Sequence, residues 1–363
     1  FHSLTHLKLS LSSAREYLNQ KDQDMFCFTT GLKYLYLGDI SFDRCLPNLF
    51  KGLNQLETLI LENTRFCPEL DDNHLMYLSG IKEITIKGWI NIKTRVVLSL
   101  TNIESITIKS ITLDSYEIFK SLTKLNKLVL NEMENYIDRN IIKSLINIKN
   151  LDLASSKIVF DVPKSNQTIS NEQSKSPKSK KAKLNQSVTN QISNNNQEDS
   201  KPFFLDVFEN LKSLTHLNLY GIAFKNIDNT IFRHFGNLEV LHFGHISLDF
   251  NSRLVLNRNL FRPLTKLIHL DLTQSQITIQ GNDCFSPLVT LKRLILDECN
   301  VYSSKASDFW DQLKNLEILS IQNFKLVPKL NLYKLSELTR LTELNLRICD
   351  QDLVDFSEFI KQS

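Results

Sequence analysis

Apolar residues recur along this chain at fixed offsets. In one stretch, Phe208, Leu211, Leu214, Leu217 and Leu219 form the pattern F-x-x-L-x-x-L-x-x-L-x-L. The final L-x-L alternates as a β-strand does when one of its faces is buried. The upstream part has a three-residue period, which favours a short 3₁₀ or helical segment. Because one such unit cannot bury its own apolar face, copies must stack and share a continuous core.

The phrase L-x-x-L-x-L, with Ile or Phe allowed for Leu, occurs about thirteen times. Its first residues are roughly 22 to 29 positions apart, with one gap of about 66. In many copies a Phe or Trp precedes the phrase by six positions, as Phe26 and Trp310 do. We call the first residue of each phrase the opening residue and count offsets from it. The opening residues are Leu4, Leu32, Leu56, Ile81, Ile103, Leu125, Ile148, Leu214, Leu238, Leu267, Leu291, Leu316 and Leu341.

This spacing resembles that of the leucine-rich repeat family. The resemblance implies an α/β solenoid shaped like a curved horseshoe. Its concave side would be a parallel β-sheet of about 13 strands, and short helical or 3₁₀ segments would lie on the convex side. The family usually has Asn at offset 8, where its amide caps the turn. This chain has Ser, Thr or Cys at some of these positions, which can replace part of that hydrogen bonding, and Ile, Trp, Met or Phe at others.

The long gap between repeats has a different composition. From Ser165 to Ser200 most residues are Ser, Asn or Gln, and none is aromatic. Such a segment cannot bury enough apolar surface to offset the entropy of ordering it. The sequence therefore predicts a first block of about seven repeats over 1–160, a disordered low-complexity insertion over 161–202, and a second block of about six repeats over 203–363.

The insertion accounts for the net charge of the whole chain, which is +3. The run Lys178–Lys183 resembles a short basic nuclear-import signal. A solvated polar linker and a contact switched by phosphorylation at Ser176 are the alternative interpretations. The six cysteines have no C-x-x-C spacing and do not form the cysteine clusters that cap secreted leucine-rich repeats. The sequence therefore favours an intracellular protein, cytoplasmic or nuclear.

In each predicted strand, offsets 3 and 5 point into the core and offsets 2, 4 and 6 lie on the concave face. In the leucine-rich repeat family, which this spacing resembles, the residues at these exposed positions carry the function. Charges of both signs are mixed along them, which disfavours a track for nucleic-acid phosphates. Aromatic and histidine side chains gather at two places, one around Tyr34 and one in the second block, where His245 is also near. The candidate binding residues are Tyr34, Tyr36, His216, Tyr220, His242, His269, Asp271 and Arg293.

Histidines with an aspartate could hold a metal ion. However, His216 and His269 share a column two strands apart, which corresponds to about 10 Å, too far for one ion. We therefore expect no metal site and no cofactor. Acidic residues near His74, at Asp71 and Asp72, are interpreted as solvated charges in a connection between repeats.

No motif for a nucleophile elbow, a metalloprotease or a phosphate-binding loop occurs in the sequence. We therefore expect a non-enzymatic module in which the concave face binds a partner protein. The alternatives are the substrate-recognition region of an F-box-type ubiquitin ligase and a ligand-binding receptor ectodomain. No small-molecule substrate, nucleic acid or membrane span is expected. Since Phe1 is not a Met and Phe359 could begin another repeat, we expect a segment of a longer protein.

Overall fold

The computed structural model describes most of the repeat-bearing sequence. The predicted insertion over 161–202, including Lys178–Lys183, lies outside the described residues. These are residues 3–11, 17–18, 24–42, 46, 48–66, 70, 72–88, 100–110, 117–133, 137–159, 207–224, 227–248, 253–303, 309–327 and 332–347.

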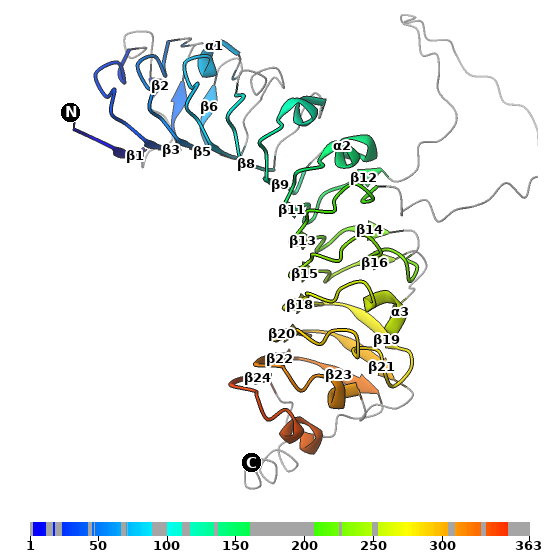
Figure 1. Ribbon diagram of the computed structural model, residues 1–363. Helices are drawn as coiled ribbons and strands as arrows, with labels where there is room; N and C mark the ends of the chain where they lie inside the picture. Colours follow the sequence, from blue (N-terminus) through cyan, green and yellow to red (C-terminus); the bar gives the residue numbers. More distant parts are fainter. Residues whose placement is uncertain are drawn as a thin grey trace, which may run out of the picture.

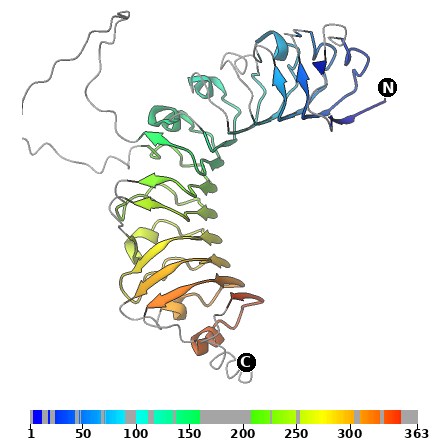
Figure 2. The same ribbon diagram turned by 180° about the vertical axis from the view of Figure 1, so that it is seen from behind.

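A parallel sheet of 13 strands follows the inner side of the curved chain (Figures 1 and 2). Each strand lies between those of the preceding and following repeats, so the solenoid predicted from the spacing is confirmed. The strands are β1 His6–Ser10, β3 Tyr34–Gly38, β5 Thr58–Glu62, β7 Glu83–Lys87, β8 Ser105–Lys109, β9 Lys127–Asn131, β11 Asn150–Asp152, β13 His216–Asn218, β15 Val240–His242, β18 His269–Asp271, β20 Arg293–Ile295, β22 Ile318–Gln322 and β24 Glu343–Arg347.

The register keeps equal offsets in one column across the sheet. Leu35 pairs with Leu59 and Leu37 pairs with Leu61, and all four are at most 1% exposed. The outward residues between them are only partly buried. The predicted assignment of offsets 3 and 5 to the core is therefore confirmed.

The rest of each repeat returns along the convex side. The aromatic residues six positions before the opening residues are buried and pack against one another, with ring centroids 6.5 Å apart for Phe26 and Phe50 and 5.6 Å for Phe261 and Phe285. Short helices occur here as predicted. They are α1 Asp72–Leu75, η3 Glu117–Ser121, α2 Arg139–Ser144, α3 Arg258–Phe261, η5 Phe309–Gln312 and η6 Leu332–Glu337.

The return segments also form short parallel sheets that the sequence did not reveal. Their order is β2-β4-β6, β10-β12, β14-β16 and β17-β19-β21-β23. The strands are β2 Tyr17–Leu18, β4 Ser41–Phe42, β6 Arg65–Phe66, β10 Ile137–Asp138, β12 Ile158–Val159, β14 Ala223–Phe224, β16 Ser247–Leu248, β17 Leu254–Leu256, β19 Gln276–Ile279, β21 Asn300–Ser303 and β23 Lys325–Val327.

Strand length changes along the main sheet. Strands β1 to β9 of this sheet have five residues each, whereas β11, β13, β15, β18 and β20 have three. In β11, β13 and β18 the last residue is Asp152, Asn218 or Asp271, and its side chain accepts a hydrogen bond from the backbone N–H two residues later, at 2.9 to 3.0 Å. This local bond competes with the ladder for the same N–H, so the strand ends there.

The sheet continues across the predicted insertion. Strand β11 pairs directly with β13, so that Leu151 lies opposite Leu217 although 66 positions separate them in the sequence. Figure 1 shows that the stack of repeats changes direction in this region, between β9 and β13.

Polar residues at offset 8 bond to the preceding repeat, as the sequence predicted. Thr64 Oγ1 donates to the carbonyl oxygen of Leu37 at 3.0 Å, and Ser156 Oγ donates to that of Leu130 at 2.6 Å. The Cys299 thiol contacts a carbonyl oxygen in the same way. Ser275, which is also buried, has no hydrogen-bond partner for its hydroxyl, so the substitution for the family's Asn is incomplete.

A set of asparagines that was not recognised from the sequence lies one position before the opening residues. The side-chain amides of Asn102, Asn147, Asn237 and Asn315 each donate to a backbone carbonyl of the preceding repeat at 2.8 to 3.0 Å. These bonds join successive repeats at the end of the sheet where the strands begin.

The described residues include no helix that is long and apolar enough to span a membrane.

Candidate functional site

The predicted binding residues lie on or directly after the strands of the concave sheet. Tyr34 and Tyr36 are on β3, near one end of the sheet. The remaining six are on or just after β13, β15, β18 and β20, in the second part of the sheet. The structure therefore separates them into an N-terminal cluster and a C-terminal cluster.

The N-terminal cluster consists of His6, Lys8, Tyr34, Tyr36 and Glu62. The rings of His6 and Tyr34 stack with their centroids 5.7 Å apart, and the Lys8 ammonium lies 5.8 Å from the Tyr34 ring centroid. The Tyr36 hydroxyl donates to Glu62 Oε2 at 3.3 Å. Partial burial, and then the Glu62 charge, raise the pKa of Tyr36. Contacts between strands thus hold both tyrosines in fixed orientations on the concave face.

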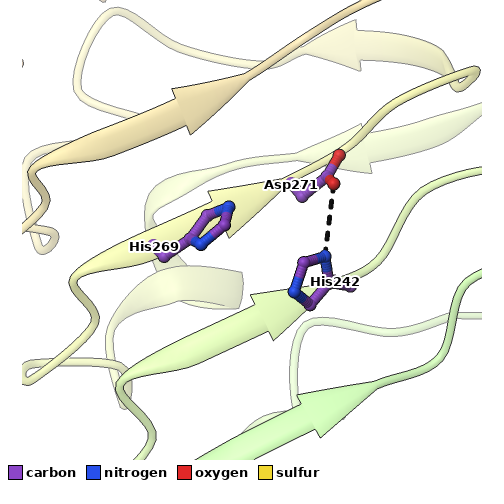
Figure 3. Close-up of side chains that lie close together, drawn as sticks. All are labelled: His242, His269 and Asp271. Carbon is purple, nitrogen blue, oxygen red and sulfur yellow. Dashed lines mark hydrogen bonds and ion pairs between the residues drawn. The ribbon is translucent and has the colours of Figure 1, made fainter. Parts of the chain in front are cut away.

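The C-terminal cluster is centred on His242, His269 and Asp271 (Figure 3). His242 lies directly opposite Asp271 on the neighbouring strand, and its Nδ1 is 3.2 Å from Asp271 Oδ2. His269 precedes Asp271 by two residues on the same face, and its ring meets that of His242 edge to face at a centroid distance of 5.0 Å. The two imidazoles and the carboxylate therefore converge on one point of the sheet.

Burial and hydrogen bonds set the protonation of this cluster. Burial, aided by the neighbouring His242, lowers the pKa of His269 to about 4, so this ring is neutral near pH 7. Burial acts to raise the pKa of Asp271, but the hydrogen bonds from His242 and Thr273 outweigh it and hold that pKa below its usual value. Asp271 Oδ1 accepts from both the backbone N–H and the hydroxyl of Thr273, at 2.9 and 2.6 Å.

The Nε2 atom of His269 is buried and has no hydrogen-bond partner. A buried polar atom without a partner costs about 1–3 kcal/mol. His269 therefore has a ring nitrogen that no group of the protein uses.

The other predicted residues lie around this centre. Tyr220 stacks on His245 with a centroid distance of 5.6 Å, and its hydroxyl donates to Gln274. Burial, followed by the charge of Asp271, raises the pKa of Tyr220. Arg293 is exposed and lies opposite His269 on β20.

Solved structures of known proteins share this architecture. A chain of the TLR13–ssRNA13 complex matches 94% of this chain with a TM-score of 0.62 and 18% identity, and 43% of its own length is covered. An internalin (InlF) from Listeria monocytogenes strain 4b F2365 matches 96% with a TM-score of 0.58 and 16% identity, and 88% of its length is covered. This chain has the leucine-rich repeat fold. The chain spans less than half of the TLR13 chain that it matches.

A third leucine-rich repeat structure is the plant peptide hormone receptor RGFR1 in complex with RGF2. It matches 95% of this chain with a TM-score of 0.52 and 17% identity, and 52% of its length is covered. No protein-family model and no curated protein matches the sequence.

The register places His216 two strands from His269, as the sequence indicated. Val240 lies between them, so His216 does not join His242, His269 and Asp271. His74 is fully buried in α1, with its ring 5.5 Å from that of Phe66 in an edge-to-face contact. It therefore belongs to the core. The solvated charges were expected at Asp71 and Asp72, whose side chains lie outside what the structure describes.

Several partners of the predicted residues were not identified from the sequence. Thr273 follows Asp271 by two positions, and this Asp-x-Thr spacing is typical of a side chain that bonds to its own backbone. Glu62 and Gln274, which bond to Tyr36 and Tyr220, lie 26 and 54 positions away. Their proximity follows from the repeat register rather than from any local motif.

Proposed function

We propose that this chain is a non-enzymatic protein-binding module that holds a partner protein against its concave sheet. The N-terminal cluster carries this proposal. It combines two aromatic side chains with polar tips, and contacts between strands fix their orientation before binding. Aromatic residues with polar tips are enriched where proteins bind one another, and a fixed orientation reduces the entropy lost on binding.

The charges on the concave sheet favour a protein partner over a nucleic acid. Lys87 and Glu62 form an ion pair at 3.8 Å on adjacent strands, and charges of both signs are mixed further along the face. A nucleic-acid phosphate backbone would require a stripe of positive charge. The charged residues at offsets 2, 4 and 6 of the described strands are Lys8, Glu62, Glu83, Lys87, Lys109, Lys127, Asp152, Asp271, Arg293, Asp297, Glu343 and Arg347.

The test compares variants of the two faces in quantitative affinity purification. The double variant Tyr34→Ala, Tyr36→Ala removes two aromatic side chains from the concave face. Tyr302→Ala is the matched control, because Tyr302 is 41% exposed and lies on β21 in the convex sheet. We expect the double variant to reduce capture of the partner about 30-fold, the effect of losing a typical binding hot spot, and Tyr302→Ala to retain it. If the double variant and Tyr302→Ala captured the partner equally well, the proposal that the concave face binds it would be refuted.

A ligand-binding receptor ectodomain is the second candidate. The observation that favours it is the likeness in fold to RGFR1, a peptide hormone receptor solved with RGF2. A further matching chain comes from the Toll–Spatzle complex of Drosophila, with a TM-score of 0.53, 14% identity, and 96% of this chain and 48% of that one covered. Detecting the native protein on the surface of intact cells would favour this role, whereas finding it only inside the cell would favour an intracellular module.

A further inference from the structure

His242, His269 and Asp271 form the one group of at least three His, Cys, Asp or Glu residues suited to a metal ion within the part of the chain that the structure describes. One ligand atom from each residue lies within 4.8 Å of the other two. From this geometry we propose that the three side chains bind a divalent transition-metal ion of the zinc class, on the concave sheet between β15 and β18.

The geometry is close to what such an ion requires. Nitrogen and oxygen ligands of a tetrahedral Zn²⁺ ion lie about 2.0–2.1 Å from the metal, and therefore about 3.4 Å from one another. The His242–Asp271 pair is already at 3.2 Å. Because no pair of ligand atoms is more than 4.8 Å apart, the atoms must approach by at most about 1.4 Å, which rotation of an imidazole about its side-chain bonds can supply.

Backbone pairing and hydrogen bonds fix the positions of two of these ligands, Asp271 and His242. Hydrogen bonds from Thr273 hold the Asp271 carboxylate in a fixed orientation. Parallel pairing of β15 and β18 places His242 opposite that carboxylate. Such supporting hydrogen bonds orient ligands and strengthen metal binding. Water would fill the fourth position, because three protein ligands are present.

The unpartnered Nε2 of His269 is the second observation that points to a ligand. Buried polar atoms in proteins nearly always have a partner, and an exception requires an explanation. A bound metal ion would give the Nε2 atom of His269 a partner.

The chemistry of the donors selects the class of ion. Two imidazoles with one carboxylate suit Zn²⁺ and its neighbours among the transition metals. Ca²⁺ and Mg²⁺ prefer sites made of oxygen ligands, so neither should compete. The Arg293 guanidinium, opposite His269, opposes the binding of any cation and provides a charge that can be removed independently of the ligands.

The expectation that no metal binds rested on the separation of His216 from His269. Val240 lies between these two histidines in the register, and the proposed third ligand is Asp271 instead of His216. The proposal is therefore a revision of the expectation that no metal binds, and it does not depend on the protein-binding role.

The test is metal titration of the full chain, purified without a histidine tag and freed of metal by a chelator. Zn²⁺ is titrated against a chromogenic chelator, and Co²⁺ is used to read the coordination from its visible spectrum. We expect one ion per chain in the cluster, bound in the presence of excess Mg²⁺. His242→Ala and His269→Ala should each weaken binding at least about tenfold, since loss of even a supporting residue costs about 10–100-fold.

Three further variants make the result specific. Asp271→Asn keeps an oxygen that can accept the Thr273 bonds but removes the charge, and should weaken binding while circular dichroism shows an intact fold. Arg293→Gln should strengthen binding. His216→Ala is the matched control and should leave binding unchanged. Absence of Zn²⁺ binding, or an equal loss of binding in His216→Ala and His269→Ala, would overturn the proposal.

Discussion

At Gly244, neighbouring repeats approach so closely that only a hydrogen atom fits. A Cβ atom at this position would lie 2.4 Å from the carbonyl oxygen of Thr273 and 2.9 Å from its nitrogen. The obstacle is backbone, so it cannot rotate away. We expect Gly244→Ala to lower the free energy of unfolding by about 1–3 kcal/mol, the usual cost of overpacking, as measured by urea denaturation.

Gly236→Ala provides the control for this prediction. The nearest atom to its added Cβ would be the Pro263 carbonyl oxygen at 3.9 Å, an ordinary contact. Removing a glycine without strain stabilises a protein by about 0.4–1 kcal/mol. If Gly244→Ala were as stable as Gly236→Ala, the close approach between the repeats would be contradicted.

The buried cysteines should resist alkylation. Burial raises the pKa of Cys299 to about 12 and that of Cys284 above its usual range. The thiolate is the reactive form, so iodoacetamide at pH 8 should modify neither residue in the folded protein and both after denaturation. Cys27, which is partly exposed, is the internal reference, and peptide mass spectrometry measures all three. If Cys299 were alkylated as fast as Cys27, the Cys299 thiol would be accessible to solvent in the folded protein.

For single residues, the sequence predicts which positions share a column of the sheet better than it predicts which side chains touch. His242 and Asp271 both have offset 4 in consecutive repeats, so the pattern already placed them side by side. Whether the His269 ring leans toward them depends on side-chain rotation, which no spacing encodes. The buried position of His74 also depends on packing, because it follows from the Phe66 ring beside it.

Among the elements, the asparagines before the opening residues offer the clearest test. Asn237 Nδ2 donates to the Lys212 carbonyl oxygen at 3.0 Å, which joins two repeats. We expect Asn237→Ala to lower the free energy of unfolding by about 1–2 kcal/mol, because it also removes the bond that Asn237 Oδ1 accepts from Lys266 and each hydrogen bond contributes about 1 kcal/mol. Hydrogen exchange should locate the loss at the junction of β13 and β15.

Asn237→Asp separates the amide donor from the size of the side chain. It retains the shape and the oxygen that accepts from Lys266 Nζ at 2.8 Å but cannot donate to the carbonyl, so it should be less stable than the unchanged chain. A fully stable Asn237→Asp protein would contradict a stabilising role for the bond to Lys212.

The strands were predictable because each L-x-x-L-x-L phrase has both a period of two and a fixed spacing from the next. Their lengths were not. Asp152 and Asn218 fit the exposed column as well as Val129 does, and only the bonds from their side chains to the following backbone show that the strand must end. The short convex sheets were also not foreseen, since pairs of two residues such as Ser41–Phe42 are too brief for a period to be recognised.

For the whole molecule, the direct pairing of β11 with β13 predicts that the intervening low-complexity sequence is dispensable for folding. A variant without residues 165–200 keeps 160–164 and 201–206 as a connection. The free-energy cost of bringing the two ends of a connection together falls by about 0.6 kcal/mol per halving of its length, so the variant should be as stable as the full chain or about 1 kcal/mol more stable. Thermal unfolding measures this.

Loss of cooperative unfolding in that variant would contradict the prediction and assign the segment a structural role. Its proposed role in localisation is separate. A fluorescent reporter fused to residues 165–200 should accumulate in the nucleus if Lys178–Lys183 acts as an import signal, and an even distribution would remove that interpretation.

The pairing of β11 with β13 also bears on how the chain can be assembled. Each repeat contacts mainly its neighbours, so the surfaces that meet at this junction belong to two units that each have stacked repeats of their own. A chain cut within residues 165–200 would then consist of two pieces that recognise each other through the exposed edges of β11 and β13. Co-expressed as separate polypeptides, residues 1–164 and 201–363 should reassociate without a covalent link, which would make this junction a natural place to split the protein into complementary halves.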